Sequence, residues 1–467
     1  MAEQIAAPEA RSPDSIRDER GNLTAAFVDA VRDALEAGDG ARVRALAGGH
    51  HESDVGDLIE ALEPDDRAIL VRLLGDDFDF AALTELDEAV RLRILEDLPA
   101  REVAEGVREL ELDDAVYILE DLEPAERAEI LSRIPAPERA ALARGLEYPE
   151  DSAGRLMQTD FIAVPPSWTV GQAIDHMREA DDLPDEFYAL FVVDPSNRPV
   201  GTVALDRLLR SKRPTVISDI AEETLHVVDA TDDQEDVARR FERYNLVSAP
   251  VVGADARLVG VITVDDIVDV IEEEADEDLK ALGGVGDEEL SDDFWTTARS
   301  RFGWLSVNLV TAVAASLVIG LFADQLQQMV ALAVLMPIVA SQGGNAGTQT
   351  MTVAVRALAT RELGPHNALR IVGRELAVGL VNGLVFAVIM GVVAAVWFRL
   401  SDLGFVIAVA MVINLVAAAL GGILIPLALN RLRADPAVGS GAFVTTVTDV
   451  VGFFAFLGLA AWWFGLR

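Results

Sequence analysis

The C-terminal part of the chain contains five apolar segments that are each long enough to cross a lipid bilayer. They cover about residues 303–323, 327–354, 371–398, 404–430 and 440–465. A helix needs roughly 20 consecutive apolar residues to span the hydrocarbon core. Because lipid cannot satisfy backbone N–H and C=O groups, continuous apolar runs of this length indicate helices. We therefore predict an α-helical membrane domain with five spans over residues 301–467.

Charge divides the chain at the same place. Residues 299–467 hold ten Arg, no Lys and six acids, a net charge of +4, whereas residues 1–298 hold 28 basic and 72 acidic side chains, a net charge of −44. A surface this negative repels nucleic acids, so we expect no nucleic-acid partner. The chain has no Cys, which excludes disulfides and thiolate metal sites. Because Asp and Glu are frequent throughout, only acids that cluster are interpreted as sites.

Arginines at the ends of the spans predict the orientation of the chain. One side of the membrane would carry eight, which are Arg299, Arg301, Arg356, Arg361, Arg370, Arg374, Arg431 and Arg433. The other side would carry Arg399 and Arg467. Basic residues stay on the cytoplasmic side, so we expect a cytoplasmic N-terminus and a C-terminus outside. The N-terminal stretch Met1–Gly21 has no apolar core of a secretion signal. We expect a multi-pass protein of the cell (inner) membrane, embedded in the lipid bilayer.

The first 147 residues predict a helical domain behind a polar tail. Residues 1–24 are polar and acidic and predict a disordered tail. Over residues 25–147, short amphipathic stretches follow Pro or Asp cues such as Glu63-Pro64 and Glu123-Pro124. Proline or aspartate just before an apolar period is a helix-start signal. The irregular repetition predicts an all-α, solenoid-like domain of stacked short helices.

Two similar α/β units follow, at residues 148–212 and 213–275. The first has a helix at Val170–Glu179 and strands at 189–194 and 200–203; the second has a helix at Glu235–Tyr244 and strands at 249–252 and 258–263. The order, together with the stretch from Tyr244 to Val252, resembles a tandem pair of CBS domains, which implies a regulatory, ligand-sensing module.

Acidic residues crowd into the next segment, between residues 265 and 278. Like charges four residues apart destabilise a helix unless a cation lies between them, so this segment is expected to bind cations. Residues 276–300 are predicted to form a linking helix between the second α/β unit and the membrane domain.

One carboxylate, Asp449, lies inside the last apolar segment. A charged Asp at the centre of a membrane helix costs about 3 kcal/mol, and such residues normally face a bundle interior or water. Gly441, Thr445 and Asp449 are spaced i, i+4, i+8 and share one helix face. A small, polar face that ends in a negative charge suits a cation pathway. The alternative is an Asp that is paired with a base or protonated in lipid.

The second apolar segment carries polar and helix-weakening residues, namely Pro337, Gly343, Gly344, Asn345, Gly347 and Gln349. Proline and glycine are expected to break or thin the helix, and irregular backbone at membrane depth is tolerated only against protein or a watery cavity. The amides favour pore lining, and close helix packing through small residues remains the alternative.

Together these features resemble the MgtE family of magnesium channels. The resemblance rests on the Pro337 to Gln349 motif, the helix from Thr445 to Asp449, the stretch Tyr148 to Met157 and the domain order. It covers nearly the whole chain past residue 25. It implies a homodimer that conducts Mg²⁺ between two membrane halves, with Asp449 as the pore carboxylate and Gly441 and Thr445 on the pore face. The sequence itself has no catalytic triad or phosphate-binding loop, and its five histidines are scattered, so we expect no enzymatic activity. Five spans without an internal inverted repeat also suggest a second copy.

The resemblance further implies that cytosolic Mg²⁺ closes the pore by bridging acids of the helical domain, the CBS pair and the linking helix. The matching positions are Asp113, Asp233, Glu235, Asp266, Asp269, Glu274, Glu277, Asp278 and Asp435. Tyr117 stands where a second acid is expected one turn after Asp113. For each of these acids, acidic surface remains the alternative reading.

ATP is a second ligand that the resemblance implies. CBS units grip ribose with a Thr or Ser and an Asp three residues later. The second unit has Thr263 and Asp266, but the first has Ala204 and Arg207, which weighs against ATP binding here. Two other functions remain open: a carrier for another divalent cation such as Co²⁺ or Mn²⁺, which similar ligands would suit, and a membrane-bound cation sensor that does not conduct.

Overall fold

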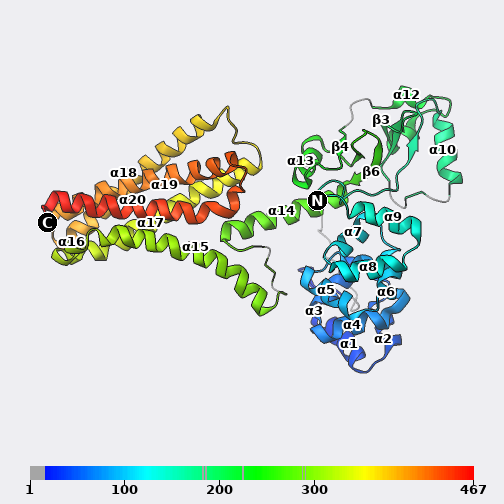
Figure 1. Ribbon diagram of the computed structural model, residues 1–467, viewed down its shortest axis with the longest axis horizontal. Coiled ribbons are helices and arrows are strands. Elements are labelled where there is room, and N and C mark those ends of the chain that lie inside the picture. Colours follow the sequence, from blue (N-terminus) through cyan, green and yellow to red (C-terminus); the bar gives the residue numbers. More distant parts are fainter. Residues whose placement is uncertain are drawn as a thin grey trace, which may run out of the picture. The chain divides into compact units, whose positions relative to one another are not determined.

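The computed structural model describes residues 16–180, 183–184, 187–222, 226–286, 288–289 and 291–466. The chain forms two compact units, Met1–Glu273 and Glu274–Arg467. The first contains the helical domain and the α/β pair, and the second contains the membrane-spanning helices (Figure 1).

The helical domain consists of short helices joined by tight turns. They are α1 (Ala25–Glu36), α2 (Gly40–Ala47), α3 (Glu52–Ala61), α4 (Pro64–Leu74), α5 (Glu88–Asp97), α6 (Ala100–Val107), α7 (Leu112–Glu120), α8 (Pro124–Arg133) and α9 (Ala136–Gly145), with 3₁₀ turns at Gly75–Asp77 and Phe80–Leu83. Helices α4 and α8 begin at the predicted prolines, because proline needs no hydrogen-bond acceptor in the first turn.

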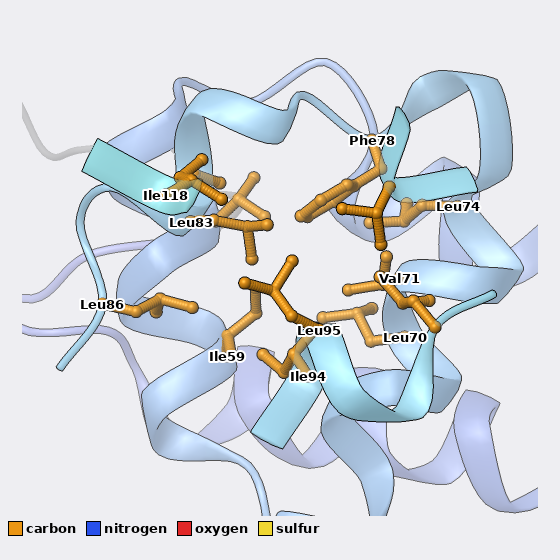
Figure 2. Packing of buried hydrophobic residues seen from close by; sticks show 14 of the residues in the cluster. Ile59, Leu70, Val71, Leu74, Phe78, Leu83, Leu86, Ile94, Leu95 and Ile118 are labelled. Atoms are coloured by element: carbon orange, nitrogen blue, oxygen red, sulfur yellow. The ribbon is translucent and has the colours of Figure 1, made fainter. Parts of the chain in front are cut away.

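A continuous apolar core holds these helices together. Ile59, Leu70, Leu83 and Ile118 are at most 1% exposed and contribute from α3, α4, a 3₁₀ turn and α7. Figure 2 shows these side chains converging with Leu74, Phe78 and Leu95. Burial of apolar side chains from successive helices is the stabilising term expected for a stacked helical domain.

The N-terminal segment differs from the predicted tail within the described residues. Residues 16–24 lie against α3, because Arg17 forms an ion pair of 2.6 Å with Asp57 and another with Asp54. Two acids on one helix face therefore attract a base that the composition alone assigned to a disordered tail. Residues 1–15 lie outside the described part of the chain.

The two α/β units have the predicted order of elements. The first contains β1 (Ala163–Val164), α10 (Val170–Glu179), β2 (Ala189–Val193), β3 (Pro199–Ala204), α11 (Leu205–Arg210) and α12 (Ile217–Ile220). The second contains β4 (Val228–Asp229), α13 (Gln234–Tyr244), β5 (Ser248–Val252), β6 (Leu258–Thr263) and α14 (Val264–Gly283). Each sheet has the same three-strand topology, with a parallel and then an antiparallel pairing and a bulge at the equivalent place.

Helix α14 continues past the expected end of the second α/β unit. Residues 276–300, expected as one linking helix, are divided between the last turns of α14 and the start of α15 (Phe294–Gly320). Asp293 caps α15 by accepting a hydrogen bond of 3.1 Å from the Thr296 N–H. This cap places the start of the first apolar helix before the position that apolarity alone suggests.

The described part of the chain has five helices long and apolar enough to span a membrane. They are α15, α17 (Val330–Ala359), α18 (Ala368–Phe398), α19 (Ser401–Arg431) and α20 (Pro436–Phe464), with the short α16 (Ala323–Gln328) between the first two. Helix α19 has more buried residues than the other four and packs against α17, α18 and α20. The predicted break in α17 is absent, since the helix is continuous through Pro337 and the glycines.

Candidate functional site

The carboxylate of Asp449 lies near the middle of α20 and is half-buried. Among the described residues, no hydrogen bond or ion pair satisfies it. The alternative in which a basic side chain neutralises Asp449 therefore finds no support within one copy of the chain. A carboxylate at this depth needs water, a cation or a proton.

Gly441 and Thr445 extend the same side of α20 by two turns. A methyl group added to Gly441 would meet no atom within 4 Å, so this surface is open. The Thr445 hydroxyl donates to the Gly441 carbonyl at 2.9 Å, which satisfies its proton and leaves oxygen lone pairs as acceptors. Helix α20 therefore presents oxygen atoms beside Asp449.

The glycines of α17 divide into two groups with different surroundings. A methyl group on Gly347 would lie 2.6 Å from Val444 in α20, and one on Gly343 would overlap the amide of Asn414 in α19. These two glycines are close-packing positions. A methyl group on Gly344 would meet nothing within 4 Å, so this glycine belongs to an open surface. Close packing therefore describes Gly343 and Gly347, whereas Gly344 lies on the kind of open surface that the pore-lining prediction expects.

The open side of α17 is polar. Asn345 and Gln349 are exposed in the single chain, as are Pro337, Ser341 and Thr348. In an apolar helix, such a surface is stable only against protein or water. It is therefore a candidate to face a pore or a second copy of the chain.

The end of α14 packs against the membrane helices within the second unit. Ala281 is 7% exposed and lies in one apolar cluster with Met351 and Val355 of α17 and with Ala437 and Val444 of α20. Val444 directly precedes Thr445 in the sequence. The last turns of α14 are thus in contact with the two helices that carry the candidate pore residues.

A second concentration of acids lies in the first unit, between α7 and α14. Asp113 is 7% exposed, and its Oδ2 has no hydrogen-bond partner in the described structure. Burial and the nearby Asp266 raise the pKa of Asp113 well above its usual value. Burial likewise raises the pKa of Asp266 to about 7, against the effect of the 2.8 Å hydrogen bond from the Thr263 hydroxyl. The charged form of both carboxylates is therefore disfavoured in the metal-free protein.

Neighbouring acids enlarge this cluster. Burial, followed by the charges of Asp269 and Asp265, raises the pKa of Asp114 to about 6. Burial and then the charge of Glu85 raise the pKa of Asp269. Asp114 and Glu85 were not predicted as site residues, because an acid on a helix surface has no sequence signal until folding brings a second helix against it.

A buried arginine occupies the other end of this region. Arg91 of α5 is 2% exposed, forms an ion pair with Asp121 and donates to the Leu86 carbonyl at 3.1 Å. Its guanidinium carbon lies 4.3 Å from the centre of the Tyr117 ring, a cation–π contact. Burial raises the pKa of Glu273 in α14, and the charge of Arg91 lowers it. Tyr117, which stands where a second acid was expected, is thus next to the fixed positive charge of Arg91.

Two other predicted acids of the CBS pair, and one at the start of α20, make local contacts. Asp233 caps α13 by accepting from the Glu235 N–H at 3.1 Å, and Glu235 forms an ion pair of 2.7 Å with Arg239. Asp435 caps α20 by accepting from the Ala437 N–H at 2.7 Å. Glu274, Glu277 and Asp278 lie on the second half of α14, within the second unit.

The donor set suits a weakly held Mg²⁺ better than a closed metal cage. Among the described residues, no group of three or more His, Asp or Glu side chains is arranged to chelate a metal. Mg²⁺ keeps several waters and often binds through one or two carboxylates. The unpartnered Oδ2 of Asp113, with Asp266 nearby, fits an ion of this kind.

The residues considered for nucleotide binding are engaged with other groups of the protein. Thr263 and Asp266 are joined to each other by a hydrogen bond, and Asp266 is half-buried near Asp113. In the first α/β unit, Arg207 forms an ion pair of 2.9 Å with Glu222. A shallow pocket nearby is lined in part by Tyr188, Phe191 and Thr263. Thr263 therefore borders a pocket, but its acidic neighbour is engaged elsewhere.

Family profiles match three parts of the chain. The MgtE profile, described as divalent cation transporter, matches residues 336–459. The MgtE intracellular N domain matches residues 50–151, and the CBS domain matches residues 153–213 and 217–273.

Curated relatives extend the similarity to full length. The magnesium transporter MgtE of Thermus thermophilus is 31% identical over 451 residues, which are 92% of this chain and 97% of that protein. The magnesium transporter MgtE of Bacillus subtilis is 33% identical over 80% of this chain and 84% of that protein. That of Enterococcus faecalis is 36% identical over 68% and 70%.

Two solved structures are each similar to about half of the chain. A crystal structure of the soluble part of a magnesium transporter has 28% identity and a TM-score of 0.46, covering 54% of this chain and 98% of that one. The cytosolic domain of the Mg²⁺ channel MgtE in complex with ATP has 30% identity and a TM-score of 0.48, covering 52% and 99%.

Proposed function

The chain belongs to the MgtE family of divalent cation transporters, and we propose that it carries Mg²⁺ into the cell through a homodimer pore that closes when cytosolic Mg²⁺ is abundant. The relatives' names describe transporters, and transport rather than catalysis is the activity proposed here.

The observation that carries this proposal is the half-buried Asp449 without a protein partner in the described residues. Mg²⁺ loses its water reluctantly, so a pore that keeps the ion hydrated needs only one or two carboxylates. Two copies of the chain would supply two such groups. A cation bound by both would offset the cost of placing each carboxylate in the membrane.

The open polar surface of α17 supports the homodimer. Gly343 and Gly347 pack inside one copy, whereas Gly344 and Asn345 face away from it. A second copy related by twofold symmetry would cover this surface and enclose a polar path. The same arrangement would place the open side of α20, with Gly441 and Thr445, along that path.

The acids between α7 and α14 support closure by cytosolic Mg²⁺. With the ion bound, Asp113 and Asp266 lose their mutual repulsion, and the helical domain stays against α14. Without the ion, repulsion favours separation. Helix α14 continues to Ala281, which packs against α17 and α20, so a change at its first half biases the pore helices. Mg²⁺ thus selects between two states that differ in affinity for it.

The proposed closure by cytosolic Mg²⁺ also implies an orientation of the chain in the membrane. If the acids respond to cytosolic Mg²⁺, the first unit lies in the cytoplasm, as the arginine distribution also predicts. Closure then acts as negative feedback on uptake. With five spans, a cytoplasmic first unit would put the C-terminus outside.

Mg²⁺ flux into proteoliposomes made with the full chain tests the proposed gating. We expect uptake at low internal Mg²⁺ and a steep decline as internal Mg²⁺ rises. Flux that does not depend on internal Mg²⁺ contradicts the gating, and absence of flux under all conditions favours a non-conducting sensor.

A carrier for another divalent cation is the second candidate, because the matching family is described as a divalent cation transporter and oxygen ligands suit several hard cations. Competition between Mg²⁺ and Co²⁺ or Mn²⁺ in the same vesicles separates the two. We expect Mg²⁺ uptake to persist in an equal concentration of either competitor. Uptake of Co²⁺ or Mn²⁺ in preference to Mg²⁺ contradicts the proposal.

A further inference from the structure

A buried asparagine, Asn414, lies at the centre of the membrane helices. It belongs to α19, between Ile413 and Leu415, and is 0% exposed. Asparagine is costly in an apolar helix, because its amide must lose water before it is buried. A leucine or alanine at such a position avoids that cost, so the retained amide indicates a specific contact.

The amide of Asn414 lies between two glycines on two different helices. A methyl group on Gly452 of α20 would lie 2.8 Å from its Nδ2 and 3.0 Å from its Oδ1, and a methyl group on Gly343 of α17 would overlap it. Real side chains do not approach this closely, so neither glycine tolerates a substituent while Asn414 keeps its place. One amide thereby fixes which faces of α17 and α20 turn toward α19.

A hydrogen bond makes the arrangement directional. Nδ2 of Asn414 donates to the Val339 carbonyl of α17 at 2.8 Å, while Oδ1 has no partner in the described structure. An apolar side chain of similar size would fill the space but would not select one carbonyl along α17. The bond therefore sets register as well as spacing between α17 and α19.

The pinned faces determine where the candidate pore residues point. At about 100° per residue, Gly452 lies roughly 60° around α20 from Asp449, and Gly343 lies roughly 160° around α17 from Asn345. With both glycines against Asn414, Asn345 turns to the opposite side of its helix, and Asp449 stays at the edge of the packed surface.

We propose that Asn414 is a positioning residue, which sets the rotation of α17 and α20 and thus directs Asn345 and Asp449 toward the ion path. The inference rests on the proposed function, because the pore role of Asp449 defines what is positioned. Its chemistry is a hydrogen bond and steric contact with two glycines, and Asn414 itself does not touch the ion.

Cysteine labelling of the full chain in vesicles tests this rotation, since the chain has no other Cys. Thr445→Cys reports the open side of α20, and Val447→Cys reports a different side. In Asn414→Ala, we expect labelling at position 445 by a charged, water-soluble thiol reagent to slow several-fold and labelling at 447 to speed up. The half-saturating Mg²⁺ concentration for uptake, measured in the variant without added Cys, should rise roughly tenfold, because small misplacements of a binding group are costly.

A reciprocal variant and a matched control separate positioning from packing. Gly452→Ala should produce the same shifts from the other side of the contact, and combining it with Asn414→Ala should restore them in part, because the added methyl group enters the vacated space. Met411→Ala is the control for lost packing volume, since Met411 is also 0% exposed in α19 and lies in an apolar cluster with Ala387 of α18 and Ile338 of α17. If Asn414→Ala does not fold, Gly452→Ala and Asn414→Ser carry the test.

The outcomes are distinct. Unchanged labelling and unchanged half-saturation in Asn414→Ala and Gly452→Ala, with a loss of thermal stability like that of Met411→Ala, overturn the proposal. If position 445 is not labelled even with Asn414 present, the pore assignment of this helix face fails instead. Shifts in both variants that the double variant restores support the proposal.

Discussion

The hydroxyl of Thr263, at the end of β6, donates a hydrogen bond of 2.8 Å to Oδ2 of Asp266, in the first turn of α14. This bond holds one acid of the cluster in place and lowers its pKa, yet burial raises that pKa to about 7 overall. Asp266 therefore changes its protonation near physiological pH, so a proton and a bound cation would compete for it.

Protons should compete with Mg²⁺ at the acid cluster. The pKa values of Asp114 and Asp266 in the folded protein, about 6 and about 7, lie above the usual 3.8. Their metal-free contribution to stability is present below the unfolded pKa and is lost as pH rises through 6 to 7. Without Mg²⁺, we expect the helical domain to resist proteolysis better at about pH 5.5, below both folded pKa values, than at about pH 8, above both.

Mg²⁺ should reverse this trend, because binding requires ionised carboxylates. The Mg²⁺ concentration that protects half of the full-length protein from proteolysis should be lower at about pH 8 than at about pH 6. An equal requirement at both pH values, with intact folding, contradicts a role for these acids in binding.

Replacing one buried acid should weaken the response to Mg²⁺. Asp113→Asn removes a charge that lies near Asp266 and keeps the shape of the side chain. We expect the free energy of unfolding of the metal-free protein to rise, because the neutral amide removes a charge that burial and the nearby Asp266 both disfavour. Closure should need more internal Mg²⁺. Asp65→Asn is the control, because that side chain is 96% exposed, and it should change neither measurement.

The buried Arg91 should be essential to the stability of the helical domain where it faces Asp121 and Glu273. Arg91→Met leaves Asp121 without its buried partner and removes the attraction that lowers the pKa of Glu273. Breaking a buried pair in this way costs about 3–5 kcal/mol, measured by chemical unfolding. Arg93→Met is the matched control on the same helix, because its side chain is 55% exposed. Equal effects of the two substitutions contradict the assignment.

The two groups of glycines in α17 should respond differently to a methyl group. Gly347→Ala would place one 2.6 Å from Val444, whereas Gly344→Ala meets nothing within 4 Å. Overpacking typically costs about 1–3 kcal/mol, so we expect a lower melting temperature for Gly347→Ala only. Similar melting temperatures for the two variants would show that α17 and α20 are not in close contact at Gly347.

Periodicity and composition predicted much of the fold. The five spans follow from apolar length, and the helices and strands of the CBS pair follow from short apolar runs separated by turn residues, as at Val170–Glu179 and Leu258–Thr263. Asp449 was conspicuous because a lone acid in an apolar run is costly.

Features that depend on contacts between distant segments could not be predicted. Asp114, Arg91 and Asn414 acquire their surroundings only when separate helices meet, and no local pattern marks them. Helix α17 stays continuous through Pro337, because membrane helices tolerate proline where neighbouring helices pack against them. The sensing roles of Asp233 and Glu235 remain predictions, since one copy of the chain engages both in local contacts.

Asp449 binds the transported ion in the proposed pore, and Mg²⁺ uptake by Asp449→Asn in proteoliposomes tests this role most directly. Asp402→Asn, in the first turn of α19, is the control for the loss of one acid from the membrane domain. We expect uptake to fall to background in Asp449→Asn and to persist in Asp402→Asn, with both proteins folded. Full uptake in Asp449→Asn would contradict the claim.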